Sequence, residues 1–82
     1  MNKNMYVYIL RSKSNISKTY VGLSNDFKRR LREHNRGESK YTSKYIPWKL
    51  ETVHWFSDKQ KAYNFERYLK TASGIAFRNK RF

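Results

Sequence analysis

The chain has six Asp and Glu residues, too few for a centre that binds two metal ions through many carboxylates. One of them, Glu66, lies at the margin of an apolar stripe. In the second of two long predicted helices, Ala62, Phe65 and Leu69 recur at helical spacing. Glu66 directly follows Phe65, and a carboxylate near a core is costly unless it is paired or binds a cation. A single carboxylate with waters and substrate phosphate oxygens suits Mg²⁺. An ion pair with one of the 19 Lys and Arg residues is the alternative.

Arg30 and His34 lie four residues apart in the first predicted helix, so their side chains face the same way. A guanidinium and an imidazole in that arrangement can converge on one phosphate. Alternatively, Arg30 is one solvated cation among Lys28, Arg29 and Arg32, and His34 is a histidine favoured by the dipole at a helix C-terminus. Periodicity alone leaves both interpretations open.

Tyr8 and Tyr20 lie in two predicted neighbouring strands and can meet across the ladder. Cross-strand aromatic packing is the ordinary explanation of such a pair. A phenol with a pKa of about 10 is mostly protonated at neutral pH. A nearby metal ion or guanidinium would lower that pKa and make the phenol a usable proton acceptor. A site that combines Arg30, a cation at Glu66 and a tyrosine is therefore chemically coherent.

Three strands and three helices are predicted to position these groups, in the order β-β-α-β-α-α. The strands are Met5 to Arg11, Lys18 to Gly22 and a third that begins at Pro47 and Trp48, in which Leu50, Thr52, His54 and Phe56 alternate with Lys49, Glu51, Val53 and Trp55. The first helix follows a cap at Asn25 or Asp26 and ends at Gly37. The second helix begins at a capping box of Ser57 and Gln60 and is closed by Gly74. A short third helix spans Ser73 to Lys80. The polar stretch Glu38 to Ile46 is predicted to be a loop.

The charge balance points to a polyanionic partner. Nineteen Lys and Arg residues against six Asp and Glu give a net charge of +13, and neutralised phosphates would release counterions. A basic surface with no specific ligand is the alternative. The absence of cysteine excludes disulfides, thiolate zinc sites and cysteine nucleophiles. We expect one domain over residues 1–82, with no membrane span and a cytoplasmic location.

The order of these motifs resembles the GIY-YIG nuclease superfamily over nearly the whole chain. Val7-Tyr8-Ile9 and Tyr20-Val21-Gly22 match the paired strand signatures, and Arg30 follows Tyr20 by the family's interval of ten residues. The nearest subgroup consists of small stand-alone proteins similar to the N-terminal nuclease domain of the bacterial excision-repair endonuclease subunit that makes the incision. The resemblance implies an α+β fold with a three-stranded antiparallel sheet flanked by helices.

The resemblance also implies roles for individual residues. Glu66 would hold one Mg²⁺ or Mn²⁺ ion, Arg30 would bind the scissile phosphate, and His34 would assist proton transfer. Either tyrosine can be the base that activates water, with Tyr8 slightly favoured over Tyr20. The expected contacts to nucleic acid are Arg29, Lys40, Lys44 and Asn79, of which Asn79 matches a late asparagine of the family.

Two departures from the family pattern bear on activity. Val7 replaces the first glycine of the GIY signature, a common change in the stand-alone group. Leu23 stands where the repair nuclease has a lysine, which removes one phosphate contact or proton donor and puts the turnover rate in doubt.

The function predicted from these features is hydrolysis of DNA by a metal-dependent endonuclease in repair or recombination, with a further protein partner that supplies specificity. A nucleic-acid-binding module without turnover is the alternative. A ribosomal-type RNA-binding protein fits the charge but leaves Glu66 unexplained.

Overall fold

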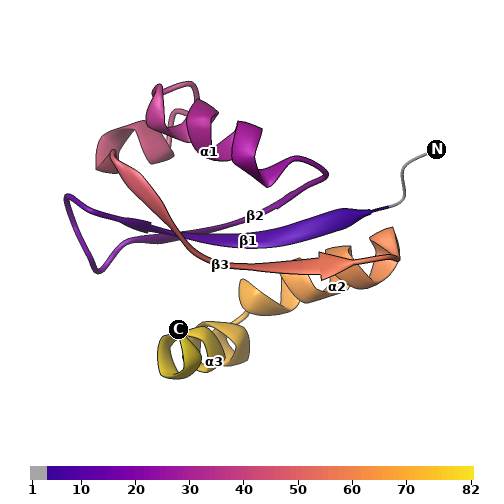
Figure 1. Cartoon of the computed structure of the whole chain (residues 1–82). Coiled ribbons are helices and arrows are strands. Elements are labelled where there is room, and N and C mark those ends of the chain that lie inside the picture. The colour runs from indigo at the N-terminus through magenta and orange to yellow at the C-terminus, as the bar shows by residue number, and fades with distance from the viewer. Residues whose placement is uncertain (1–3) are drawn as a thin grey trace.

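The computed structural model describes residues 4–82 as a three-stranded antiparallel sheet with helices on both faces (Figure 1). The elements are β1 (Met5–Ser12), β2 (Thr19–Ser24), α1 (Phe27–Asn35), the 3₁₀ helix η1 (Thr42–Tyr45), β3 (Trp48–Phe56), α2 (Lys59–Leu69) and α3 (Ala72–Arg81). The predicted α+β fold and order β-β-α-β-α-α are confirmed, with η1 as an addition. The sheet order is β2-β1-β3, so β1 is central and β2 and β3 form the two edges.

Both faces of β1 are covered, which explains why its apolar residues run continuously. α1 packs on one face, and α2 with α3 packs on the other (Figure 1). The buried core residues of the side covered by α1, here called the α1 face, are Tyr8, Leu10 and Trp48. Those of the side covered by α2 and α3, here called the α2 face, are Val7, Ile9, Val21, Ala62 and Leu69.

A β-bulge interrupts the alternation predicted for β3. Ile9 of β1 pairs with Thr52, whereas the next residue, Leu10, pairs with Leu50. Glu51 is therefore an extra residue, and the alternation shifts by one at this point. Because paired residues share a face, Leu50 lies with Leu10 on the α1 face and Thr52 lies with Ile9 on the α2 face. The prediction that Leu50 and Thr52 share one face is wrong for this reason.

Aspartates cap α1 and α2. Asp26 accepts a hydrogen bond from the backbone N–H of Arg29 at 3.0 Å, in agreement with the predicted cap. Asp58 accepts one from the N–H of Gln60 at 2.9 Å, so the predicted cap at Ser57 is wrong by one residue. A carboxylate in this position satisfies a backbone donor and interacts favourably with the helix dipole.

The junction of α2 and α3 also differs from the prediction. α2 ends at Leu69, and the hydroxyl of Thr71 caps α3 by accepting a hydrogen bond from the N–H of Gly74 at 3.1 Å. Gly74 therefore lies inside α3 and does not close α2. A Cβ at Gly74 would overlap the backbone carbonyl of Tyr68, so glycine is needed for the close approach of the two helices.

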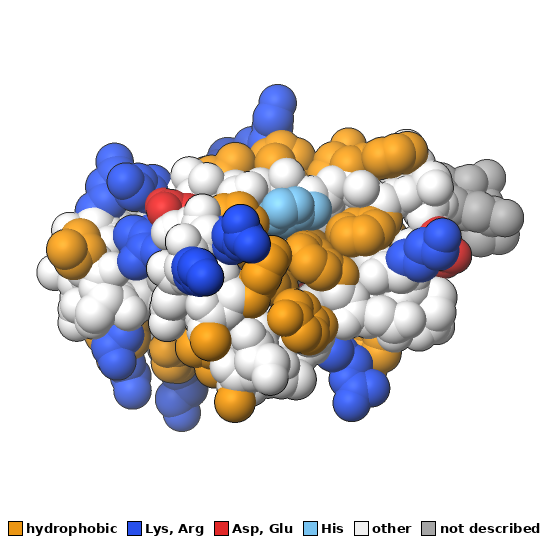
Figure 2. Space-filling model, turned by 90° about the horizontal axis from the view of Figure 1, so that it is seen from below, with side chains coloured by type: hydrophobic (Ala, Val, Ile, Leu, Met, Phe, Trp, Pro, Cys, Tyr) orange, Lys and Arg blue, Asp and Glu red, His pale blue; other side chains and the backbone are white. Residues whose placement is uncertain are grey.

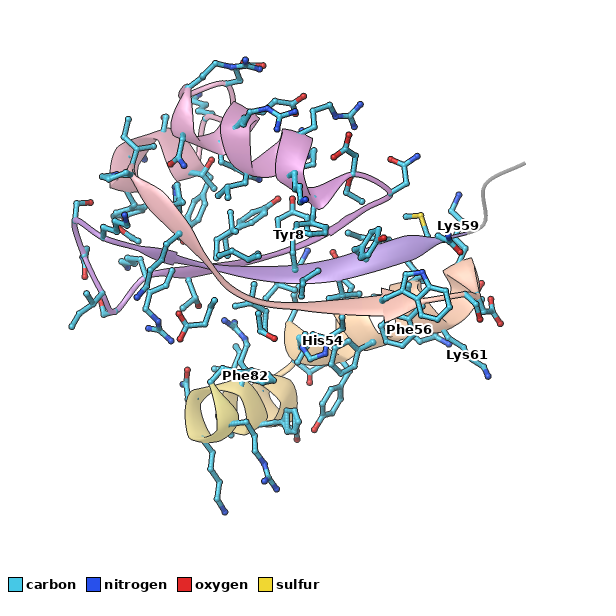
Figure 3. The ribbon with its side chains drawn as sticks, in the orientation of Figure 1. Tyr8, His54, Phe56, Lys59, Lys61 and Phe82 are labelled. Carbon is cyan, nitrogen blue, oxygen red and sulfur yellow. The ribbon has the colours of Figure 1, made fainter. Side chains whose placement is uncertain are left out.

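Partly exposed apolar side chains gather around a histidine on the underside of the molecule, with Lys and Arg at the rim (Figure 2). His54 belongs to this side, and its ring centroid lies 5.1 Å from that of Phe65 and 5.5 Å from that of Phe82 (Figure 3). Among residues 4–82, none of the helices combines the length and apolarity that crossing a bilayer requires.

Candidate active site

The side chain of Tyr8 lies across the neighbouring strand β2. Tyr8 pairs with Gly22 in the register of β1 and β2, and a Cβ at Gly22 would overlap the tip of the tyrosine ring. Tyr8 is 1% exposed and lies between the sheet and α1 (Figure 3). Because β2 is an edge strand, the phenol group ends near an open edge of the sheet. The requirement for glycine at position 22 thus comes from the tyrosine that covers it.

A directed series of hydrogen bonds runs from this phenol into the protein. The Thr42 hydroxyl donates to the carbonyl of Ser39 at 3.4 Å, so it accepts from Nδ1 of His34, which lies 2.8 Å away. His34 consequently carries its proton on Nδ1, and its Nε2 accepts the phenol proton of Tyr8 at 3.2 Å. The Arg30 guanidinium lies close enough to the Tyr8 oxygen to act on the pKa of the phenol.

Burial controls the ionisation of both central groups. It raises the pKa of Tyr8 and outweighs the opposing effect of the nearby Arg30 guanidinium. The expectation that a guanidinium lowers this phenol's pKa is confirmed for the contribution of Arg30, but the net pKa is raised because desolvation is larger. Burial and the positive charge of Arg30 together lower the pKa of His34, which keeps the imidazole neutral at pH 7.

Tyr20 and Arg30 form the more open side of the cluster. The ring centroid of Tyr20 lies 4.7 Å from that of His34 and 6.3 Å from that of Tyr8. Tyr20 is partly buried, and the Arg30 side chain is 36% exposed. The structure therefore brings together four of the predicted site residues, and of these Arg30 and Tyr20 are accessible from solvent.

Glu33, one turn beyond Arg30, was not predicted to belong to the site. Its carboxylate forms an ion pair with Arg30, and its side chain is 21% exposed. The same carboxylate lies 3.5 Å from Nε of Arg29, whose side chain is 52% exposed. An acid three residues after Arg30 lies on the same helix face, and this spacing is the signal from which the pair could have been predicted.

The segment predicted as a loop holds His34 in place. Its central part is η1, which contains the fully buried Thr42. The Thr42 hydroxyl binds His34, and the Thr42 backbone carbonyl accepts a hydrogen bond from Nε1 of Trp48 at 2.8 Å. The prediction of an irregular loop over Glu38 to Ile46 is wrong in this part, because the polar run shows no period from which a buried threonine could be recognised. Lys40 and Lys44 of the same segment are exposed.

Glu66 lies apart from the cluster, on α2 and hence under the opposite face of the sheet (Figure 1). Its Oε2 lies 2.7 Å from Nζ of Lys70, and its side chain is 14% exposed. Asn79, the other predicted residue on this side, is exposed on α3. Within residues 4–82, no group of three or more His, Cys, Asp or Glu side chains is placed to hold a metal ion.

The orientation of α2 nevertheless turns Glu66 toward the edge that carries the Tyr8 phenol. Ala62 and Leu69, both fully buried, mark the line of α2 that faces the sheet. Phe65 lies on the flank toward β3, where its ring contacts those of His54 and Phe56.

Glu66 is one residue further on, about 100° round the helix, and therefore lies on the other side of that line. This flank faces β2, which α2 also contacts. The carboxylate and the phenol thus approach the same edge strand from its two faces.

The donor set at Glu66 fits a hard divalent cation better than a transition metal that prefers nitrogen or sulfur ligands. One carboxylate, already stabilised by a cation and partly open to water, suits Mg²⁺ or Mn²⁺ that keeps most of its water ligands. Glu66 is thus the residue of α2 able to hold such an ion.

Comparison with known proteins adds an independent observation. The family model described as the GIY-YIG catalytic domain matches residues 4–80. A relative from Drosophila mojavensis, named structure-specific endonuclease subunit SLX1 homolog, is 45% identical over 69 residues, which cover 73% of this chain and 23% of that protein. A Cryptococcus neoformans SLX1 subunit is 44% identical over 66 residues, covering 72% of this chain and 13% of its own length.

Shorter bacterial proteins match as well. A UPF0213 protein of Bacillus licheniformis is 36% identical over 69 residues, which cover 83% of this chain and 69% of the relative. The chain therefore spans a quarter or less of these two SLX1 subunits and about two thirds of this bacterial protein. The family predicted from the sequence is confirmed by these matches.

Proposed function

We propose that this chain, which belongs to the GIY-YIG family, hydrolyses a phosphodiester bond of DNA with one divalent ion, Mg²⁺ or Mn²⁺, held by Glu66. The observation that carries the proposal is the buried phenol of Tyr8, which is hydrogen-bonded to the His34 imidazole and lies under the influence of the Arg30 guanidinium beside the open edge of β2. A guanidinium oriented in this way can bind a phosphate and stabilise the charge that develops on it during attack.

Tyr20 is better placed than Tyr8 to accept the proton of the attacking water. Tyr8 is 1% exposed, its oxygen is hydrogen-bonded, and its raised pKa makes the phenolate hard to form. Tyr20 is partly exposed and its ring packs against His34. In this scheme Tyr8 is a positioning residue for Arg30 and His34, and Tyr20 faces the substrate.

Glu66 would contribute from the other side of β2. A divalent ion bound there would offset negative charge on the phosphate and lower the pKa of a bound water. Arg29, Lys40 and Lys44, all exposed, would contact the DNA backbone on the side of α1, and Asn79 on the side of α3.

The names of the SLX1 relatives suggest a substrate class. They describe structure-specific endonuclease subunits, so we infer branched DNA as the preferred substrate, a role in repair or recombination, and a protein partner that contributes specificity. The net charge of +13 favours binding of such a polyanion.

Incubation of the protein with supercoiled, linear and branched DNA tests the proposal. Cleavage should require Mg²⁺ or Mn²⁺ and stop with EDTA. Glu66→Gln and Arg30→Ala should each lower the rate by about a hundredfold or more, because each removes charge stabilisation from the transition state.

Two variants serve as matched controls for this experiment. Glu51→Gln removes a carboxylate of similar exposure that pairs with Arg11, and Lys28→Ala removes an exposed cation of α1. Both should cleave like the unmodified protein. Undiminished nicking by Glu66→Gln would discard the metal site. Salt-sensitive binding without any metal-dependent product would favour a binding module that has no turnover.

A further inference from the structure

The ion pair at Glu66 occupies the position where a divalent cation would bind. Nζ of Lys70, one turn further along α2, lies 2.7 Å from Oε2 of Glu66. The Glu66 side chain is only 14% exposed, while that of Lys70 is 52% exposed. A carboxylate with so little access to water is stabilised by a cation, so Lys70 supplies within the chain the charge that a metal ion would bring.

Lys70 also borders a shallow hollow on the outer side of α2. The hollow measures about 340 Å³ and is lined by Asn64, Arg67, Tyr68, Lys70 and Thr71. Arg67 adds a second cation, whose guanidinium carbon lies 5.6 Å from the ring centroid of Tyr63. Two cations beside an amide and a hydroxyl group are the donors that typically contact a nucleic-acid phosphate.

We propose that Lys70 is a switch residue that holds Glu66 in the metal-free protein and binds a DNA backbone phosphate in this hollow, together with Arg67, once a divalent ion occupies Glu66. The proposal rests on the proposed function, since it takes Glu66 as the metal ligand. A divalent ion and an ammonium group on one carboxylate repel each other, and the exposed stem of Lys70 allows it to move away. Metal and DNA binding would therefore assist each other, by the same factor in both directions.

The first half of the proposal concerns metal binding in the absence of DNA. It is tested by adding Mn²⁺ to the DNA-free protein and measuring the electron paramagnetic resonance signal of the free ion, which decreases as the ion binds. Lys70→Met keeps the length of the side chain and removes its charge. We expect it to bind Mn²⁺ roughly three- to tenfold more tightly than the unmodified protein, because the metal no longer displaces an ion pair that is partly screened by solvent. Lys59→Met, at the far end of α2, should leave the affinity unchanged (Figure 3).

Affinity for a short branched DNA with uncleavable linkages tests the second half. With EDTA, Lys70→Met should weaken binding less than Arg67→Met does, because Glu66 already neutralises Lys70. With Mn²⁺, the two substitutions should weaken binding to a similar degree. An equal effect of Lys70→Met with and without metal would overturn the switch.

Glu66→Gln separates failure of this inference from failure of the proposed function. If Glu66→Gln loses Mn²⁺ binding while Lys70→Met and a second variant, Lys70→Gln, bind like the unmodified protein, the switch is wrong and the metal site stands. If Glu66→Gln binds Mn²⁺ normally, the metal ligand itself is wrong. Thermal unfolding of each variant shows that the fold is intact.

Discussion

The cluster on the α1 face and the carboxylate on the flank of α2 are built in different ways. Tyr8, His34 and Thr42 come from three elements, and their hydrogen bonds fix one another inside the protein, with Arg30 at the solvent-accessible side. Glu66 depends on a single helix and a partner one turn away, at the margin of solvent. Under the proposed function, this difference would divide a preorganised phosphate site from a carboxylate that changes partner when a cation binds.

The largest expected effect distinguishes the two tyrosines within the α1-face cluster. Tyr20→Phe should lower the cleavage rate by roughly 10²- to 10⁴-fold, the usual contribution of a general base, with little change in stability. Tyr8→Phe should lower the free energy of unfolding as well, by about 1–3 kcal/mol, because the buried imidazole of His34 loses its hydrogen-bond partner. Chemical denaturation and cleavage rates of both variants check this. A Tyr20→Phe protein that cleaves normally would return the role of base to Tyr8.

A smaller effect tests how tightly the α1-face cluster is packed. Gly22→Ala should destabilise the protein by about 1–3 kcal/mol and reduce cleavage, because the new methyl group displaces the tip of the Tyr8 ring. Gly37→Ala, where φ is 78° and the nearest atom to a new Cβ is the Cβ of Ser43 at 3.8 Å, should cost about 1 kcal/mol and leave cleavage intact. Denaturation curves with rate measurements separate the two. Equal loss of activity in both variants would contradict a specific contact at Gly22.

The smallest effect concerns pH. The pKa of His34 is lowered in the folded protein, mainly by burial, so below about pH 6.5 the unfolded chain takes up the proton more readily. Stability from this group is present above that pH and is lost as the pH falls toward the lowered pKa. His34→Gln should therefore flatten part of the decline in unfolding free energy between pH 7 and pH 5. Burial also lowers the pKa of His54, so His54→Gln should flatten another part. An unchanged decline in His34→Gln would show that this imidazole is not desolvated.

Local spacing predicted the elements and much of the cluster. Arg30 and His34 were placed together because residues four apart share a helix face, and Tyr8 met Tyr20 through strand pairing. Thr42 was missed because a polar run without a period does not reveal which hydroxyl group will be buried. The place of Glu66 under the other face depends on how α2 crosses the sheet, which no local pattern encodes.

The remaining differences between prediction and structure are the bulge in β3 and the position of Gly74, where the chain departs from regular local patterns. The bulge at Glu51 appears only in the pairing of β3 with β1, which the alternation of residues along β3 does not reveal. Glycine commonly ends helices, so the sequence predicts a helix end at Gly74. Its position is instead set by the carbonyl of Tyr68, which leaves no room for a Cβ.

Anomalous scattering from a crystal soaked in Mn²⁺ would show directly whether the cluster on the α1 face and the Glu66 carboxylate belong to one site. The arrangement around β2 predicts a single strong peak at the Glu66 carboxylate, with Lys70 turned away, on the flank of α2 that faces the edge strand bearing Tyr20. A peak at Glu33 or Glu51 in place of Glu66, or no peak at any carboxylate, would contradict a shared metal and phosphate site.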